Sequence, residues 1–367
     1  MSPGNGRLIR DLVPPPIVGY KGLMRGRVPL ATALTLAVLA GCGGGDSAGP
    51  GPATSPSPTS VVTVTVPVAS SAVPSDPAPV AAWRRQADAP EPRQEVAAAA
   101  VGGRIWVVGG ITDDGPATAV ESYDPVTDRW QAGPDLPQPL HHVAAAAFRG
   151  ELVVVGGFAG GGADLYDRPS DRVLVLRGDA WVDLPRLRRP RGAAAVAVAG
   201  DTLYVVGGRD RDLLVRPTEA FDGTAWSDRA PIPVPRDHLG AAGDGHHLYA
   251  VGGRYLGAGE TTDSVERYDP AADAWQTLPP LPTARGGLGL TVAGGRVIAA
   301  GGEDAARVFP QVEAFDPVAN AWAPLPPMAT ARHGLALVTV AGTVYALVGG
   351  AAAGVAPSDV TESLATP

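Results

Sequence analysis

Short apolar segments separated by polar turns fill the chain from residue 80 onward. Some are rich in small residues, such as 96–101, 143–148 and 193–198, and each is followed by a segment rich in β-branched residues. Segments of this length, bounded by Gly, Pro and Asp, predict β-strands joined by tight turns. We therefore expect an all-β domain with few helices.

A pair of glycines marks the end of the β-branched segment and recurs along the chain. The pairs are Gly109-Gly110, Gly156-Gly157, Gly207-Gly208, Gly252-Gly253, Gly301-Gly302 and Gly349-Gly350. Their spacings are 47, 51, 45, 49 and 48 residues. A self-similar period of this length indicates a repeat fold in which each repeat forms one small sheet.

Two further marks recur in register with the glycine pairs. One is a tryptophan, at Trp83, Trp130, Trp181, Trp226, Trp275 and Trp322. The other is Glu-x-Tyr/Phe-Asp, which begins at Glu121, Glu219, Glu266 and Glu313. Each repeat then has four strands, with the small residues innermost, where sheets converge on an axis. The tryptophan of the outer strand fills the widening gap between neighbouring sheets.

With these three marks the chain resembles the kelch repeat family over about residues 80–366, and the resemblance implies a β-propeller. Only 17 residues follow Gly350, enough for a third strand at 359–365 but without a tryptophan strand. Trp83 precedes Arg93 by ten residues, a spacing that recurs before Arg236, Arg285 and Arg332. A strand at 80–84 is therefore expected to complete the last blade and remove free sheet edges. We predict a six-bladed kelch-type β-propeller spanning residues 80–367.

The N-terminal region predicts export and lipidation. A basic start at Met24, an apolar run over 28–40 and the tetrad Leu-Ala-Gly-Cys ending at Cys42 follow one another. The run is shorter than the roughly 20 residues that cross a bilayer. The tetrad resembles the bacterial lipobox, which implies cleavage before Cys42 and lipidation of its sulfur. We expect residues 1–41 to be a signal peptide, with translation starting at Met24, and the protein to be anchored on the extracytoplasmic face of the cell membrane. An ordinary signal peptide is the alternative.

Composition agrees with a domain on a tether. Residues 42–79 are rich in Gly, Ser, Thr and Pro, a composition typical of a disordered linker. The net charge is −8, and becomes −12 without the five basic and one acidic residues of 1–41. An acidic protein disfavours nucleic acid as a partner. We expect a monomer that touches the membrane only through its lipid.

Candidate binding residues occur in the segments between the fourth and first strands. They comprise Arg93, Arg191, Arg236, Arg285 and Arg332, with His141 at the corresponding place in the second repeat, and beside them His142, His238 and His333. A ring of arginines at the channel mouth would suit carboxylates, sulfates or phosphates. The alternative is that each arginine pins its own loop, pairing with a nearby glutamate.

The loops after the glycine pairs form a second candidate set, because they differ most from repeat to repeat. They contribute Arg209, Arg254 and Glu303. The sequence predicts no metal site or other cofactor: His142, His238 and His333 belong to alternate blades and are expected to lie apart. The copper enzyme galactose oxidase is kelch-like, but its site needs a cysteine, and Cys42 is the sole cysteine of this chain.

Two classes of function remain open. The favoured one is a non-catalytic recognition module at the cell surface that binds an unknown protein or glycan. The other is an enzyme on carbohydrates, since some six-bladed kelch proteins are sialic-acid mutarotases. Such an enzyme needs a general acid or base and an anion clamp, for which Glu303 and the arginines are the candidates.

Overall fold

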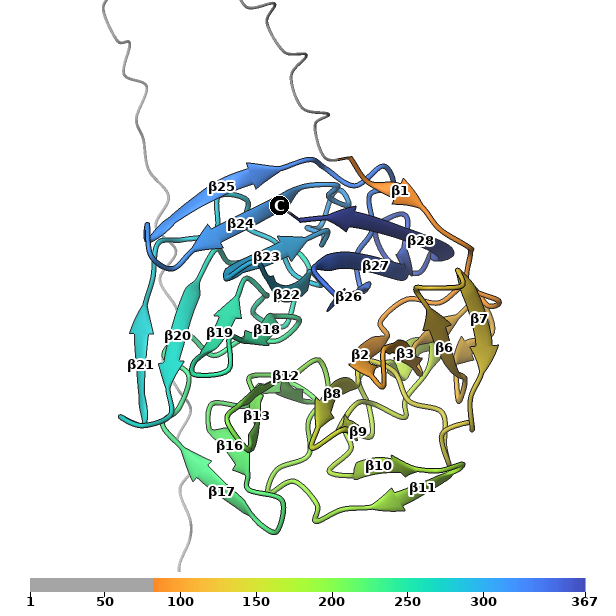
Figure 1. Cartoon of the computed structure of the whole chain (residues 1–367). Coiled ribbons are helices and arrows are strands. Elements are labelled where there is room, and N and C mark those ends of the chain that lie inside the picture. The colour runs from red at the N-terminus through yellow and green to blue at the C-terminus, as the bar shows by residue number, and fades with distance from the viewer. Residues whose placement is uncertain (1–81, 367) are drawn as a thin grey trace, which may run out of the picture. The chain divides into compact units, whose positions relative to one another are not determined.

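Six four-stranded antiparallel sheets are arranged around one axis, each with its first strand innermost (Figure 1). The structure, a computed structural model, describes residues 82–366; the predicted signal peptide, Cys42 and the linker over 42–79 lie outside these residues. The predicted all-β, six-bladed propeller is confirmed. The described residues contain no helix long and apolar enough to cross a membrane.

The blades follow one another along the chain. Blade one contains β2 (Ala97–Val101), β3 (Arg104–Val108), β6 (Val120–Asp124) and β7 (Arg129–Ala132). Blade two contains β8 (Ala144–Phe148), β9 (Glu151–Val155), β10 (Val173–Arg177) and β11 (Ala180–Asp183). Blade three contains β12 (Ala195–Ala199), β13 (Thr202–Val206), β16 (Thr218–Phe221) and β17 (Trp226–Arg229).

The other three blades have the same order. Blade four contains β18 (Gly240–Gly243), β19 (Leu248–Val251), β20 (Val265–Asp269) and β21 (Ala274–Thr277). Blade five contains β22 (Gly289–Ala293), β23 (Arg296–Ala300), β24 (Val312–Asp316) and β25 (Ala321–Leu325). Blade six contains β26 (Ala336–Val340), β27 (Thr343–Gly350), β28 (Pro357–Ala365) and, from the other end of the sequence, β1 (Arg84–Arg85).

Blade six joins the two ends of the propeller. Arg84 pairs with Ser363 and Arg85 with Glu362, so β1 is the outer strand beside β28. Trp83, just before β1, donates its indole N–H to the carbonyl of Pro326 at 2.8 Å. The other five repeat tryptophans each donate to a backbone carbonyl of the preceding blade or segment in the same way. The predicted composite blade is confirmed, and β1 closes the ring.

Apolar side chains pack between adjacent sheets rather than in one central core. One buried cluster, for example, combines Val153 and Val173 of blade two with Val205 and Phe221 of blade three. Trp226 stacks on Phe221 with ring centroids 5.0 Å apart. Because each sheet buries both faces against neighbours, the second and third strands are nearly continuous apolar runs.

The glycine-pair register of blade six differs from the prediction. His333 bridges to Gly350 as Gln94 bridges to Ile111, so Val348 and Gly349 occupy the positions of a glycine pair. The ladder between β27 and β28 shifts register between Leu347 and Gly349. Val348 accordingly has a φ of 51°, which the other blades give to glycine.

Candidate functional site

The two faces of the propeller carry different connections. The turn face has the short hairpin turns within each sheet. The loop face has the segments that enter each first strand (92–96, 139–143, 190–194, 235–239, 284–288 and 331–335). It also has the longer loops after each second strand, which include the hairpins β4 (Ile111–Thr112)–β5 (Gly115–Pro116) and β14 (Arg209–Asp210)–β15 (Leu213–Leu214) and the 3₁₀ turn η1 (Gly162–Asp164). Backbone bridges join the two kinds of segment in every blade.

One residue from each blade contributes to a closed ring of backbone on the loop face. This axial ring consists of Glu95, His142, Ala193, His238, Gly287 and Gly334. Each N–H from His142 to Gly334 donates to the carbonyl of the preceding member over 2.8–2.9 Å. The N–H of Val96 closes the ring on the carbonyl of Gly334 at 3.4 Å. The segments of all six blades are thereby tied together around the axis.

All six members of the axial ring are left-handed, with φ between 50° and 63°. Gly287 and Gly334 adopt this conformation freely, but Glu95, His142, Ala193 and His238 do so against a cost of about 1–2 kcal/mol each. Residues held in such conformations gather at functional sites. The carboxylate of Glu95 and the imidazoles of His142 and His238 therefore lie on the axis at positions where glycine would have less backbone strain.

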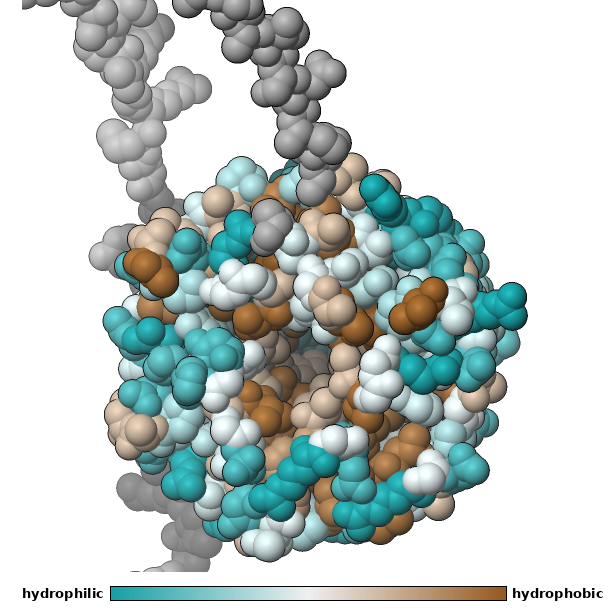
Figure 2. All heavy atoms as spheres, viewed as in Figure 1, coloured by the Kyte–Doolittle hydropathy of each residue, from teal (hydrophilic) through white to brown (hydrophobic). Residues whose placement is uncertain are grey.

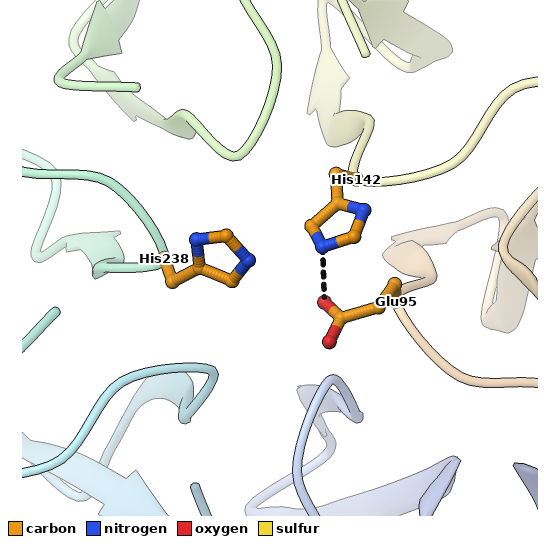
Figure 3. Close-up of side chains that lie close together, drawn as sticks. All are labelled: Glu95, His142 and His238. Atoms are coloured by element: carbon orange, nitrogen blue, oxygen red, sulfur yellow. Dashed lines mark ion pairs between the residues drawn. The ribbon is translucent and has the colours of Figure 1, made fainter. Parts of the chain in front are cut away.

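These three side chains point toward one another from three different segments (Figure 3). Their ligand atoms lie within 4.8 Å of one another, and all three residues are buried. His142 Nε2 is 3.2 Å from Glu95 Oε2, and the rings of His142 and His238 have centroids 4.7 Å apart. A Cβ at Gly334 would lie 2.7 Å from Glu95 Cδ, so glycine at that position leaves room for the carboxylate.

A second layer of polar groups orients His238. Its Nδ1 is 2.5 Å from Asp237 Oδ1, and its Nε2 is 2.7 Å from a guanidinium nitrogen of Arg254. Because guanidinium only donates, His238 Nε2 accepts and Nδ1–H donates to Asp237. Arg254 also donates to Glu303 at 3.0 Å and to Tyr166 at 3.1 Å.

Tyr166, from the loop of blade two, covers this cluster. Its ring lies edge-to-face on His142 and His238, with centroids 5.6 and 6.1 Å apart. Arg209 stacks on the Tyr166 ring at 4.2 Å. On the other side, His333 Nε2 is 3.6 Å from both Glu95 Oε1 and Glu303 Oε2. We call these residues, with the axial ring, the axial cluster.

Burial controls the protonation of the cluster. It raises the pKa of the Glu95 carboxyl, and it raises the pKa of Asp237 to about 6. It lowers the pKa of His141 to about 4, and burial also holds the pKa of His142 and of His238 well below the usual range. The three imidazoles are therefore neutral at pH 7, so one nitrogen of each ring is an acceptor.

Comparison with known proteins identifies the fold family. The kelch motif matches residues 92–137, 235–282 and 284–329, which span blades one, four and five. The solved structure of YjhT is similar, with a TM-score of 0.65 and 17% sequence identity over 75% of this chain and 95% of that chain. This chain is a six-bladed β-propeller with kelch motifs. No curated protein matches it by sequence, and at this identity the likeness to YjhT shows the fold alone.

In the kelch propeller the five predicted arginines do not line the mouth. Arg93, Arg191, Arg236, Arg285 and Arg332 are 0% exposed. Each forms an ion pair with a glutamate of the third strand of its own blade, namely Glu121, Glu219, Glu266, Glu313 and Glu362. Their guanidinium groups are turned into the blades, which corrects the prediction of an anion-binding ring. The alternative, in which each arginine pins its own loop, describes their contacts.

The other candidates of the kelch propeller do meet at the axis. His142, Arg209, His238, Arg254, Glu303 and His333 belong to the axial cluster or contact it. The expectation that the histidines of alternate blades lie apart is wrong. The axial ring is so narrow that one backbone hydrogen bond joins each member to the next. The register of His141 is also corrected: it matches Gln94, and Leu140 takes the arginine position.

Among the polar side chains of the cluster, three were not predicted as site residues: Glu95, Asp237 and Tyr166. A sequence signal exists for Glu95, because it follows Arg93 by two residues, as His238 follows Arg236. For Asp237 and Tyr166 the sequence carries no such signal, since their role depends on contacts with Arg254, 17 and 88 residues away along the chain.

Two cavities lie on the axis of the kelch propeller. The axial ring and the residue after each ring member enclose one of about 90 Å³. The innermost strands of all six blades line a second, of about 320 Å³, mainly with alanine, valine and leucine but also with Thr291 and Thr339. Figure 2 shows a hollow with hydrophobic residues at the centre of the disc. Charged side chains therefore line the axis at the loop face and not between the strands.

Proposed function

We propose that this kelch propeller is a recognition module displayed at the cell surface, which binds a protein or glycan partner across the loop face. The observation that carries the proposal is the contrast between the faces. The loops after the second strands differ in every blade, from the hairpin β14–β15 to the 3₁₀ turn η1. The turns of the other face are short and alike. Specificity on a rigid scaffold resides in such variable loops.

Exposed apolar side chains on three of these loops support a partner on this face. Leu213 is 72% exposed, Val355 59% and Tyr255 37%. They sit on blades three, six and four, and Leu213 and Tyr255 follow the charged residues Asp212 and Arg254. Aromatic and aliphatic tips beside polar groups are typical of contact surfaces for proteins and sugars.

A binding comparison between the two faces tests the proposal. The wild type is screened by thermal shift and titration calorimetry against acidic sugars, cell-wall fragments and the proteins of the same cell envelope. For any binder, Leu213→Ser/Tyr255→Ala/Val355→Ser is expected to weaken binding more than about tenfold, or about 1.4 kcal/mol. The matched control is Val126→Ser/Val318→Ser, whose valines are 92% and 98% exposed on the turn face. Binding weakened only by the control pair would contradict the proposal.

A carbohydrate-active enzyme, such as a sialic-acid mutarotase, is the second candidate. It is favoured by the Glu95–His142 pair, in which a carboxyl of raised pKa stands 3.2 Å from a neutral imidazole. Such a pair can exchange protons with a sugar's ring oxygen and anomeric hydroxyl. Glu303, the acid predicted from sequence, is instead paired with Arg254 at 3.0 Å. NMR exchange between the anomers of N-acetylneuraminic acid measures this activity. Catalysis that Glu95→Gln abolishes would support the enzyme.

The surface location is proposed from Cys42, which follows the lipobox-like tetrad. A lipid on this sulfur would tether the propeller through residues 43–79. Cell fractionation of a Cys42→Ala strain is expected to find the protein in the medium or periplasm. Unchanged membrane retention of that variant would refute the anchor without touching the recognition function.

A further inference from the structure

We propose that Glu95, His142 and His238 form a binding site for one divalent transition-metal ion on the propeller axis, with Zn²⁺ as the ion that suits it best. Two imidazoles and one carboxylate are a donor set that zinc uses when a fourth position stays open. The three ligand atoms lie within 4.8 Å of one another, on buried side chains from three blades. The proposal stands on this geometry and is independent of the proposed recognition function.

The hydrogen bonds of His142 free its Nε2 for a metal. His141 Nε2 is 3.1 Å from the carbonyl of Gly160, which can only accept, so this nitrogen carries the hydrogen. The other nitrogen of a neutral His141 then accepts from its neighbour, His142 Nδ1, at 2.5 Å. His142 Nε2 is therefore left with a lone pair, and it faces Glu95.

The spacing between His142 and Glu95 fits a bound cation. Nε2 and Oε2 are 3.2 Å apart, and both are acceptors when the carboxyl is ionised. Two facing lone pairs need a proton or a cation between them. Ligand atoms 2.0–2.2 Å from a tetrahedral zinc lie about 3.3–3.5 Å apart, so this pair already has nearly the spacing that the ion requires.

His238 is oriented in the way that metal-bound histidines are. Asp237 Oδ1 accepts from its Nδ1 at 2.5 Å, which fixes the ring and leaves the lone pair on Nε2. A carboxylate behind a ligating histidine raises the basicity of the ligand and holds its orientation. In the structure, Nε2 accepts from Arg254 at 2.7 Å. An incoming ion displaces this single hydrogen bond, while Arg254 keeps Glu303 and Tyr166 as partners.

The backbone of the axial ring brings the three ligands to the axis. Glu95, His142 and His238 have φ values of 54°, 50° and 52°, and the other ring members, Ala193, Gly287 and Gly334, share this left-handed conformation. The adjoining cavity of about 90 Å³ has room for a water in the fourth position of the ion.

Zn²⁺ binding to the full chain, produced without a polyhistidine tag, tests the site. Titration calorimetry and metal analysis after ultrafiltration are expected to find one Zn²⁺ per chain. His142→Gly and His238→Gly are expected to abolish it. These variants place glycine in ring positions that Gly287 and Gly334 already occupy, and circular dichroism checks that they fold. Asp237→Asn, which removes the negative charge behind His238 and beside Arg254, is expected to lower the affinity about 10- to 100-fold.

The matched control uses the two histidines that lie outside the axial cluster and its neighbours. His246 and His247 lie on the turn between β18 and β19, so His246→Ala/His247→Ala is expected to bind Zn²⁺ as the wild type does. Co²⁺ provides a second readout, because its visible absorption reports nitrogen and oxygen ligands and should disappear in His142→Gly. The proposal is overturned if the wild type binds no Zn²⁺, if binding survives in His142→Gly and His238→Gly, or if the control pair removes it.

Discussion

The buried arginine–glutamate pair of blade five gives a direct measure of what holds the loops to the blades. Arg285 is 0% exposed. It donates to Glu313 at 2.6 Å and to the carbonyls of Gly301 and Thr283 at 2.6 and 2.7 Å. Removing one partner leaves a buried charge without its counter-ion, which costs about 3–5 kcal/mol. We expect Arg285→Leu to lower the free energy of unfolding by that amount.

Blade two shows how the same positions are filled without charge. By strand register, Leu140 takes the place of Arg285 and Leu174 the place of Glu313, and both leucines are 1% exposed. Replacing a buried ion pair by packed apolar side chains is often neutral. The double variant Arg285→Leu/Glu313→Leu copies blade two. It is expected to be more stable than Arg285→Leu alone by about 2 kcal/mol or more.

Equilibrium unfolding in urea measures this cycle. The wild type, the variants Arg285→Leu and Glu313→Leu, and the double variant are followed by circular dichroism and tryptophan fluorescence, with midpoints compared at equal slope. If the double variant loses as much stability as the two single variants together, the two side chains do not act as a pair. The cost would then come from the lost carbonyl hydrogen bonds, and the reasoning from the buried charge would be refuted.

Two further predictions concern closure and the glycine pairs. Trp83→Ala removes the indole that donates to Pro326. It is expected to lower the free energy of unfolding by about 2–3 kcal/mol, less than the loss of a fully buried aromatic side chain, because Trp83 is half-buried. An unchanged melting temperature would mean that β1 does not close the ring. Gly301→Ala places a Cβ 2.4 Å from the carbonyl of Arg332, whereas Gly295→Ala meets nothing within 4 Å, and both have positive φ. Thermal unfolding should therefore show a larger loss of stability for Gly301→Ala than for Gly295→Ala, which loses only the roughly 1–2 kcal/mol of the unfavourable backbone conformation. Equal losses of stability in the two variants would exclude the clash as the cause.

Much of the fold was predictable because its determinants are local and repeated. The glycine pairs have positive φ in blades one to five, as the tight passage from the second strand requires. The composite blade was predicted from the spacing between Trp83 and Arg93, and it is present in the structure. The register of blade six was misplaced by one residue, because a bulge at Val348 breaks the pattern without changing the appearance of the sequence.

The site was only partly predictable, because the direction of a side chain is decided by partners distant in sequence. Arg93 and His142 both occur in segments that enter a first strand. Arg93 turns inward because Glu121, 28 residues later, neutralises it inside the blade. His142 turns to the axis because its backbone belongs to the axial ring. Spacing along the chain does not distinguish these two outcomes.

The amino-acid sequence by itself determined the all-β class, the number of blades and the way the two ends meet. These follow from strand periodicity, turn residues and sequence marks that recur within each repeat. Only the tertiary structure decided which polar residues meet. Six segments form a ring in which one backbone hydrogen bond joins each segment to the next. This ring brings ligand atoms of Glu95, His142 and His238, from three blades, to within 4.8 Å of one another. The distance between blades at the axis is a property of the closed ring, so no single repeat encodes it.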